Sequence, residues 1–223
     1  METSSIKLEM INKLAEKRRN DNQENLTKKY KQVGDYHKGV YEIWGNVSPW
    51  TKSAFNLNSE VMVVAQDWTS EEVIIKPPKN LDLSYDPDLP TNKNLQFLLG
   101  KYLNLSFSDI YATNLFVFVK PGNLSSRIPL SDLIYSATNY TIPEINIINP
   151  KLVICLGSST YKALSRAQGI NNVDFKNSID NPIILNGKCI VGVPHTGGLG
   201  TRNAGGMENV KKIWQKLSEI INS

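Results

Sequence analysis

The chain has 223 residues, of which 40% are hydrophobic and 21% are charged, and its formal net charge at pH 7 is +4. This composition is sufficient for one folded domain with a buried core, and it excludes a fibrous repeat or a disordered chain. All apolar runs are far shorter than the ~20 residues of a transmembrane helix, and the first residues lack the apolar segment of a signal peptide. We therefore expect one monomeric domain over residues 1–223 that is cytoplasmic and does not contact a membrane.

The two cysteines, Cys155 and Cys189, lie inside apolar runs, and neither has a second cysteine or a histidine at the spacing of a metal-ligand motif. This pattern argues against a structural zinc site, an iron–sulfur cluster and a disulfide framework. We expect neither a metal nor a cofactor.

Residues 1–59 precede the main body, and their apolar residues Ile6, Met10 and Leu14 recur at helical spacing. This predicts a helical extension packed on or near the domain; a lid, a DNA clamp and simple packing fit it equally well. The same segment carries the basic residues Lys17, Arg18, Arg19, Lys28, Lys29 and Lys31. These residues either contact a phosphate backbone or form a solvated helix face, and the solvated face is the more common arrangement.

Four short apolar runs follow, at residues 61–64, 110–119, 152–157 and 189–194. None alternates strictly with polar residues, which is typical of strands covered on both faces, as in a parallel sheet. Helical patterns separate the runs and close the chain. The sequence therefore predicts an α/β fold, a three-layer α/β/α sandwich with a central, mainly parallel four-stranded sheet.

Polar residues occur within or directly after these predicted strands. They are Gln66, Asp67, Trp68 and Thr69 after the first run, Asn114 within the second, Ser158 and Ser159 after the third, and His195 after the last. Because the carboxyl ends of parallel strands meet at one edge of a sheet, where ligands bind in such folds, we expect these side chains to lie close together. An acid, an amide, hydroxyls and a histidine on one rim indicate a binding or catalytic site.

Some of these residues have a structural interpretation as well as a chemical one. Asp67 either caps the next helix, or orients a water and stabilises positive charge. Asn114 either bonds to a neighbouring loop or presents its amide to the edge of a base. His195 is one of two histidines and precedes a glycine-rich loop, which argues against a core-filling role. The chain lacks GxxxxGK[ST], and no GxGxxG follows the first run, which argues against nucleoside-triphosphate and dinucleotide binding.

Four short motifs resemble, in order and placement, those of the uracil-DNA glycosylase superfamily. They are AQDWTS at 65–70, Asn114 in the second run, GSS at 157–159 and PHTGGL at 194–199. The resemblance, to a divergent member without iron–sulfur cysteines, covers roughly residues 60–215. It implies an enzyme that binds DNA, flips a pyrimidine nucleotide out of the stack and hydrolyses its N-glycosidic bond.

The resemblance also implies a role for each matching residue. Asp67 matches the acid that activates the hydrolytic water and stabilises the positively charged sugar, and His195 matches the neutral histidine that donates a hydrogen bond to O2 of the leaving base. Asn114 matches the amide that reads the pairing edge, and Gln66 precedes the acid as in the family. Leu199 matches the wedge that fills the stack after flipping. The residues that match DNA-contacting loops are Pro90, Thr91, Asn92, Ser158, Ser159, Gly197, Gly198, Leu199 and Arg202.

Two departures from the family concern the identity of the base. Thr69 stands where the best-known members have a tyrosine that excludes the C5 methyl group of thymine, so a smaller gate predicts a larger C5 substituent. The stacking aromatic has no direct counterpart, and Tyr85 is the nearest candidate, with Trp68 as the alternative. We therefore expect a monofunctional DNA glycosylase that leaves an abasic site at uracil or, in preference, at a 5-modified pyrimidine, in defence against phage with modified DNA.

Two other functions remain open. The first is a non-catalytic binder of modified or single-stranded DNA, which loss of the stacking aromatic would permit. The second is a hydrolase of free nucleosides, which would need neither Leu199 nor the basic N-terminal segment.

Overall fold

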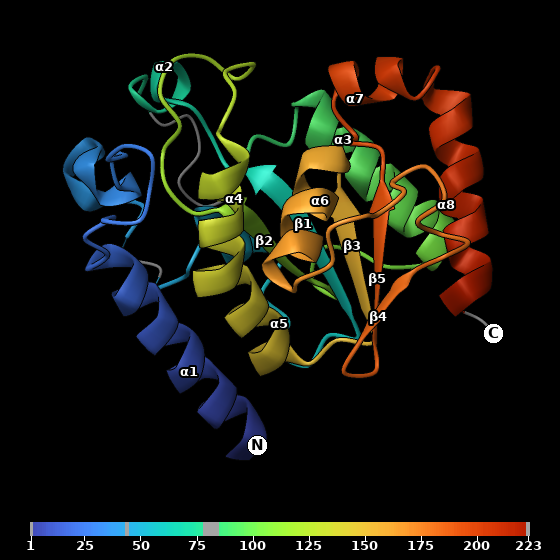
Figure 1. Ribbon diagram of the computed structural model, residues 1–223, viewed down its shortest axis with the longest axis horizontal. Helices are drawn as coiled ribbons and strands as arrows, with labels where there is room; N and C mark the ends of the chain where they lie inside the picture. The colour runs from blue at the N-terminus through green and yellow to red at the C-terminus, as the bar shows by residue number, and fades with distance from the viewer. Residues whose placement is uncertain (1, 43–44, 78–84, 222–223) are drawn as a thin grey trace.

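The fold is built on one five-stranded sheet with the strand order β2-β1-β3-β5-β4 (Figure 1). The strands are β1 (Val61–Asp67), β2 (Tyr111–Phe116), β3 (Leu152–Leu156), β4 (Ile183–Leu185) and β5 (Lys188–Val193). The structure is a computed structural model and describes residues 2–42, 45–77 and 85–221. Because β1, β2, β3 and β5 run parallel, the predicted α/β fold with a mainly parallel sheet is confirmed.

The fifth strand corrects the predicted number of four. β4 pairs antiparallel with β5 at the edge of the sheet, and the turn between them contains Asn186 and Gly187, both at positive φ. Ile184 in β4 is 64% exposed, so this short strand lacks the burial of the parallel ones. An Asn-Gly dipeptide between two apolar runs is a strong hairpin signal, and it would have indicated this strand.

Helices cover both faces of the sheet (Figure 1). They are α1 (Glu2–Arg19), α2 (Glu71–Ile74), α3 (Pro90–Leu98), α4 (Leu130–Ser136), α5 (Ile142–Ile148), α6 (Ser158–Ala167), α7 (Gly198–Asn203) and α8 (Met207–Ile221). Short 3-10 turns occur at Val33–Asp35, His37–Gly39 and Pro49–Ser53, and π turns at Leu99–Leu103 and Ala137–Thr141. None of the helices within the described ranges is long and apolar enough to cross a membrane.

Successive side chains of β1 enter two different cores because a strand alternates its side chains between the two faces of a sheet. Met62 and Val64 belong to the core shared with α1, α4, α5 and α6. Val61, Val63 and Ala65 belong to the core shared with α3 and α8. Both faces of the central strand are therefore covered, which explains why its sequence is continuously apolar.

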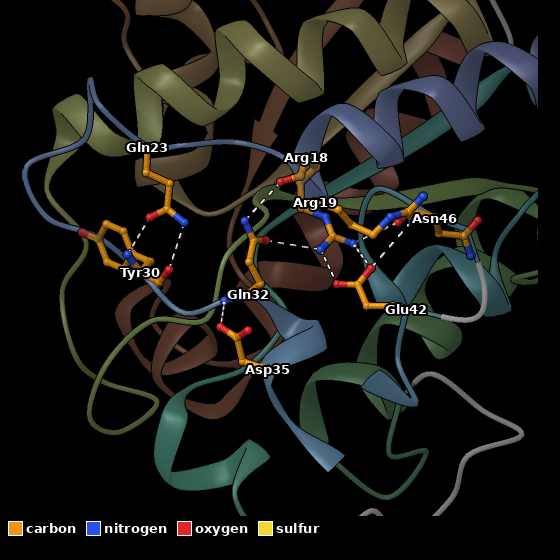
Figure 2. Close-up of polar contacts among 8 residues, drawn as sticks. All are labelled: Arg18, Arg19, Gln23, Tyr30, Gln32, Asp35, Glu42 and Asn46. Carbon is orange, nitrogen blue, oxygen red and sulfur yellow. Dashed lines mark hydrogen bonds and ion pairs between the residues drawn. The ribbon is translucent and has the colours of Figure 1, made fainter. Parts of the chain in front are cut away.

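A buried ion pair fixes the end of α1 against the segment that follows it (Figure 2). Arg18 is 1% exposed, its Nη2 lies 2.7 Å from Glu42 Oε2, and its Nη1 bonds to the other oxygen of that carboxylate. Gln32 Nε2 donates to the Arg18 carbonyl oxygen at 3.1 Å. Arg18 therefore lies neither on a solvated helix face nor on a phosphate-contacting surface, and both predicted arrangements are wrong for this residue.

Two carboxylates tie the rest of the N-terminal segment to α4 and to the turn after it. Asp132 accepts hydrogen bonds from Thr27 N at 3.0 Å, from Thr27 Oγ1 at 2.6 Å and from the Tyr30 hydroxyl at 2.6 Å. Asp21 accepts from the Tyr135 hydroxyl at 2.9 Å and from the hydroxyl of Tyr140. The segment is thus held along this side of the domain by specific polar contacts as well as by packing.

Glu144, in α5, is a fully buried carboxyl group. It accepts hydrogen bonds from the Tyr111 hydroxyl at 2.7 Å and from the Thr113 hydroxyl at 2.9 Å. Burial raises the pKa of Glu144 from an ordinary 4.5 to about 8, and the two hydrogen bonds oppose this rise only in part. The folded protein therefore favours the neutral acid over most of the physiological pH range.

We expect Glu144→Gln to remove a pH dependence of stability. Because the pKa of Glu144 is about 8 in the folded protein and near 4.5 in the unfolded chain, its stabilising contribution is complete below the lower value and is lost as the pH rises through the upper one. Between these values, the free energy of unfolding of the unmodified protein should fall relative to that of the variant by on the order of a few kcal/mol.

Urea unfolding across this pH range measures the effect. Glu60→Gln is the matched control because that side chain is 68% exposed in its ion pair with Lys151. Parallel pH profiles for Glu144→Gln and the unmodified protein would contradict the assignment.

Candidate functional site

Asp67, Asn114 and His195 lie at the carboxyl edge of the parallel strands. Asp67 is the last residue of β1 and pairs with Phe116 on β2, where Asn114 pairs with Ala65. His195 follows β5, and the charge of Asp67 acts on its titration. The structure therefore brings residues from the first, second and last predicted strands to one rim.

Asp67 forms a buried ion pair with Lys120, a residue to which the sequence pattern assigned no role. Asp67 Oδ2 lies 2.9 Å from Lys120 Nζ, and the two side chains are 10% and 3% exposed. Lys120 Nζ also donates to the Leu124 carbonyl oxygen at 2.6 Å, and Gln66 Nε2 donates to Asp67 Oδ1 at 2.8 Å. Helix α2 has Ser70 at its N-cap position, so Asp67 does not cap it. Both oxygens of the acid are thus held in place.

The backbone of Lys120 also joins the segments that follow β1 and β2. Ser70 forms an isolated parallel bridge with Lys120, and Glu71 N donates to Lys120 O at 2.9 Å. In the sequence, Lys120 directly follows the apolar run FVFV and precedes Pro121. A cation at the end of a buried run, on the same rim as an acid, was the available signal for this pair because a buried charge requires a partner.

His195 is held in a neutral form with its ring proton on Nε2. Gly197 N donates to His195 Nδ1 at 3.0 Å, so the ring proton lies on Nε2, which bonds to no other described residue. Burial lowers the pKa of His195 below its ordinary 6.5; the Asp67 charge opposes this and the Lys120 charge adds to it. The rim therefore presents an N–H donor at neutral pH.

Glycines allow three loops to approach His195 closely. A Cβ atom at Gly200 would lie 2.2 Å from the His195 carbonyl oxygen, and one at Gly197 would lie 2.7 Å from Thr91 Oγ1. Gly157, directly after β3, has a φ of +92°, and its Cβ position lies 3.6 Å from His195 Cβ. The requirement for glycine is thus steric at Gly197 and Gly200 and conformational at Gly157.

Asn114 is held by a serine from the N-terminal segment. Asn114 is 2% exposed, and its Oδ1 accepts a hydrogen bond from Ser48 Oγ at 2.6 Å. Ser48 Oγ itself accepts from Trp50 N at 3.4 Å, so its own proton is directed to the amide oxygen. Asn114 Nδ2 makes no hydrogen bond to any other described residue. Asn114 therefore bonds to a loop, as one prediction had it, and still presents an amide donor.

The start of α3 is joined to the loop after β5. Thr196 Oγ1 donates to Thr91 O at 2.8 Å, and Asn94 Nδ2 donates to Thr196 O at 2.7 Å. Pro90 is the first residue of α3 and is exposed. Asn92 is 6% exposed and donates to a backbone carbonyl of the preceding turn at 2.6 Å, so it stabilises that turn. Thr91 therefore contacts the loop after β5, Pro90 is exposed next to it in the chain, and Asn92 is buried.

The predicted stacking aromatics both take part in aromatic packing. Trp68 packs edge-on against Tyr41 with ring centroids 4.8 Å apart, and Tyr85 packs edge-on against Phe107 at 5.1 Å. Thr69, at the predicted gate, is 7% exposed. The described structure thus places a small, buried side chain beside Asp67 and engages each large aromatic with a partner.

The outer part of the rim is exposed to solvent. Gly197 is buried at the N-cap position of α7, and Leu199 in that helix is 65% exposed. The exposed or partly exposed members of the predicted DNA-contacting set beyond α3 are Ser158, Ser159, Gly198, Leu199 and Arg202. The two serines begin α6, and the other three lie in α7, so these residues come from the helices that follow β3 and β5.

Two hollows of the described surface are separate from the group formed by Asp67, Asn114 and His195. One, of about 460 Å³, borders Lys162 and Arg166 on α6, and another, of about 200 Å³, borders residues 28–31. Neither is lined by Asp67, Asn114 or His195, and neither matches the wide cavity that the small gate residue predicts. Within the described ranges, no group of three or more histidine, cysteine, aspartate or glutamate side chains is arranged to hold a metal ion.

The chain matches no protein-family model, and no curated protein matches its sequence. The geometry of the rim therefore carries the functional argument.

We expect the Asp67–Lys120 pair to behave as one energetic unit. Lys120→Met should destabilise the protein by about 3–5 kcal/mol because it leaves the Asp67 carboxylate buried without a counter-charge. The double variant Asp67→Asn/Lys120→Met should lose less stability than the sum of the losses in the two single variants, with an interaction energy of about 1–3 kcal/mol.

Urea unfolding of the four proteins in this cycle provides the measurement. Lys93→Met is the matched control because its pair with Asp88 is exposed, and we expect a change within about 0.5 kcal/mol. Additive effects of the two single substitutions at Asp67 and Lys120 would show that the pair is not coupled.

Proposed function

We propose that the protein is a monofunctional DNA glycosylase that hydrolyses the N-glycosidic bond of a flipped pyrimidine and leaves an abasic site. The observation that carries this proposal is the meeting, at one sheet edge, of the Asp67 carboxylate, the His195 Nε2–H donor and the Asn114 amide donor. The same three residues match the acid, the histidine and the amide of the uracil-DNA glycosylase superfamily in order and placement.

The charges of the rim suit the charges that develop as a glycosidic bond breaks. The sugar becomes positive, and a carboxylate such as Asp67 stabilises it and orients the attacking water. The leaving pyrimidine becomes negative, and the neutral His195 donates to it through Nε2–H. Although Lys120 and Gln66 each bond to the carboxylate, every carboxylate oxygen accepts more than one hydrogen bond, so a water can still bind to Asp67.

The preferred base in this proposal is a 5-modified pyrimidine, with uracil as the simpler substrate. Thr69 supports this preference because a threonine leaves more room than the tyrosine found there in the family. The biological setting that we propose is defence against phage whose DNA carries such bases. The exposed Leu199 supplies the wedge that fills the stack after the nucleotide is flipped out. This contact offsets the few kcal/mol that unstacking costs.

A second function, non-catalytic binding of modified or single-stranded DNA, is favoured by a different observation. Trp68 and Tyr85 are each packed against another aromatic, so neither lies free as a platform for a base. The Asp67–Lys120 ion pair also reduces the net charge that the acid offers to a sugar. A protein that recognises a flipped base without cutting it would tolerate both features.

The test compares base release by the unmodified protein and by Asp67→Asn on duplexes that contain uracil, a thymine mismatch or a 5-substituted cytosine. We expect alkali-labile sites with the unmodified protein and a loss of rate of roughly 100-fold or more in the variant, with DNA binding retained. Asp88→Asn is the matched control because that side chain is 84% exposed. Asp67→Asn alone leaves Lys120 buried without a counter-charge. The double variant Asp67→Asn/Lys120→Met removes that charge as well, so a loss of rate that persists in it is due to the missing carboxylate.

Each result of this assay decides between the functions. Cleavage of uracil alone would contradict the small-gate argument, and binding without any cleavage would favour the non-catalytic function. Leu199→Ala addresses the hydrolase of free nucleosides, because such an enzyme needs no wedge. Release of bases from free nucleosides at an unchanged rate in Leu199→Ala, together with no release from DNA by the unmodified protein, would exclude the DNA glycosylase.

A further inference from the structure

A hollow lined by lysines lies between the N-terminal segment and the segments that follow β1 and β2. It has a volume of about 200 Å³ and is formed by Lys28, Lys29 and Lys31 of the N-terminal segment on one side, and by Glu71, Val119 and Pro121 on the other. The second group comes from the segment that follows β1, which ends at Asp67, and from the segment that follows β2, which carries Lys120. The hollow therefore continues the rim onto the N-terminal segment.

The two sides of the hollow are joined through the backbone next to Lys120. Val119 N donates to Lys31 O at 3.0 Å, and the two residues form an isolated antiparallel bridge. Val119 lines the hollow, and its neighbour Lys120, one Cα step or about 3.8 Å away, pairs with Asp67. The backbone at Lys31 is thus fixed relative to the segment whose lysine pairs with Asp67.

The segment that carries these lysines is rigidly held (Figure 2). Gln23 Oε1 accepts from Tyr30 N at 2.6 Å, and Gln23 Nε2 donates to Tyr30 O at 2.9 Å. The Tyr30 hydroxyl donates to the buried Asp132 at 2.6 Å, and Thr27 bonds to the same carboxylate. A basic segment that merely needs solvation does not require this fixation, whereas a preorganised binding surface benefits from it.

The charge at the hollow is incompletely neutralised. Lys31 Nζ lies 3.1 Å from Glu71 Oε1, but Lys28 and Lys29 form no ion pair with any described carboxylate. Lys28 Nζ lies 5.3 Å from the centroid of the Tyr30 ring, and both lysines are exposed. The two unpaired ammonium groups attract an anion to this side of the rim.

We infer that Lys28 and Lys29 bind phosphates of the DNA strand whose nucleotide enters the site beside Asp67. This inference rests on the proposed function and adds a partner surface to it, one that lies outside residues 60–215. Ammonium groups bind phosphates without reading the base, so this surface contributes affinity and position, and the rim contributes recognition. It also gives the N-terminal segment the role of a fixed DNA clamp.

The experiment measures binding of the full chain to a labelled duplex that contains a stable abasic-site analogue, over a range of salt concentrations. We expect Lys28→Gln/Lys29→Gln to raise Kd about tenfold at low salt and to make the slope of log K against log salt shallower by about 1.8, which corresponds to two lost phosphate contacts on a duplex. Lys28→Arg/Lys29→Arg should bind like the unmodified protein because it keeps both charges.

The matched control is Lys162→Gln/Lys176→Gln, which removes the same charge from two other exposed lysines. If this control weakens binding and changes the salt slope as much as Lys28→Gln/Lys29→Gln, the inference is overturned, although the proposed function stands. If the unmodified protein does not bind the duplex at all, the proposed function fails as well. Unchanged urea midpoints confirm that the variants are folded.

Discussion

The buried ion pair between Asp67 and Lys120 is the contact on which the arrangement of the rim depends. It joins the last residue of β1 to the segment after β2, and the bridge between Ser70 and Lys120 joins the same two segments through the backbone. Removing one partner would leave the other as a largely buried charge without a counter-charge, so the two side chains hold each other in position. The acid at the end of an apolar strand is thus tolerated because its counter-charge comes from the segment that follows the neighbouring strand.

The N-terminal segment belongs to this site structurally, although it precedes the strands that define the fold. Ser48 bonds to the amide of Asn114, and Lys31 pairs through its backbone with Val119, next to Lys120. The Arg18–Glu42 pair and the carboxylate of Asp132 fix the segment against the domain. A division into a body that carries the sheet and an appended N-terminal segment would therefore separate residues that contact one another.

The parts of the fold that could be predicted from the sequence are those set by local pattern. Continuous apolar runs identified the four parallel strands because burial on both faces removes the polar alternation. The remaining features depend on partners far apart in the chain. Arg18 is buried only because Glu42 reaches it, and Lys120 only because Asp67 does. No spacing rule within the sequence connects Arg18 to Glu42. The position of Lys120 at the end of an apolar run did signal a buried charge, but it did not identify the partner. The short strand β4 was a different case, since Asn186 and Gly187 did mark its turn.

Lys120 has two electrostatic effects on the residues of the rim. Lys120 offsets the charge of Asp67, and its own charge also lowers the pKa of His195, which burial has already lowered. A protonated histidine beside Lys120 would place two cations together, so the ion pair and the neutral ring favour each other. With Nδ1 occupied by Gly197 N, the neutral ring has its proton on Nε2. The same lysine that anchors the acid therefore helps to keep the histidine in the form that donates a hydrogen bond without carrying a full charge.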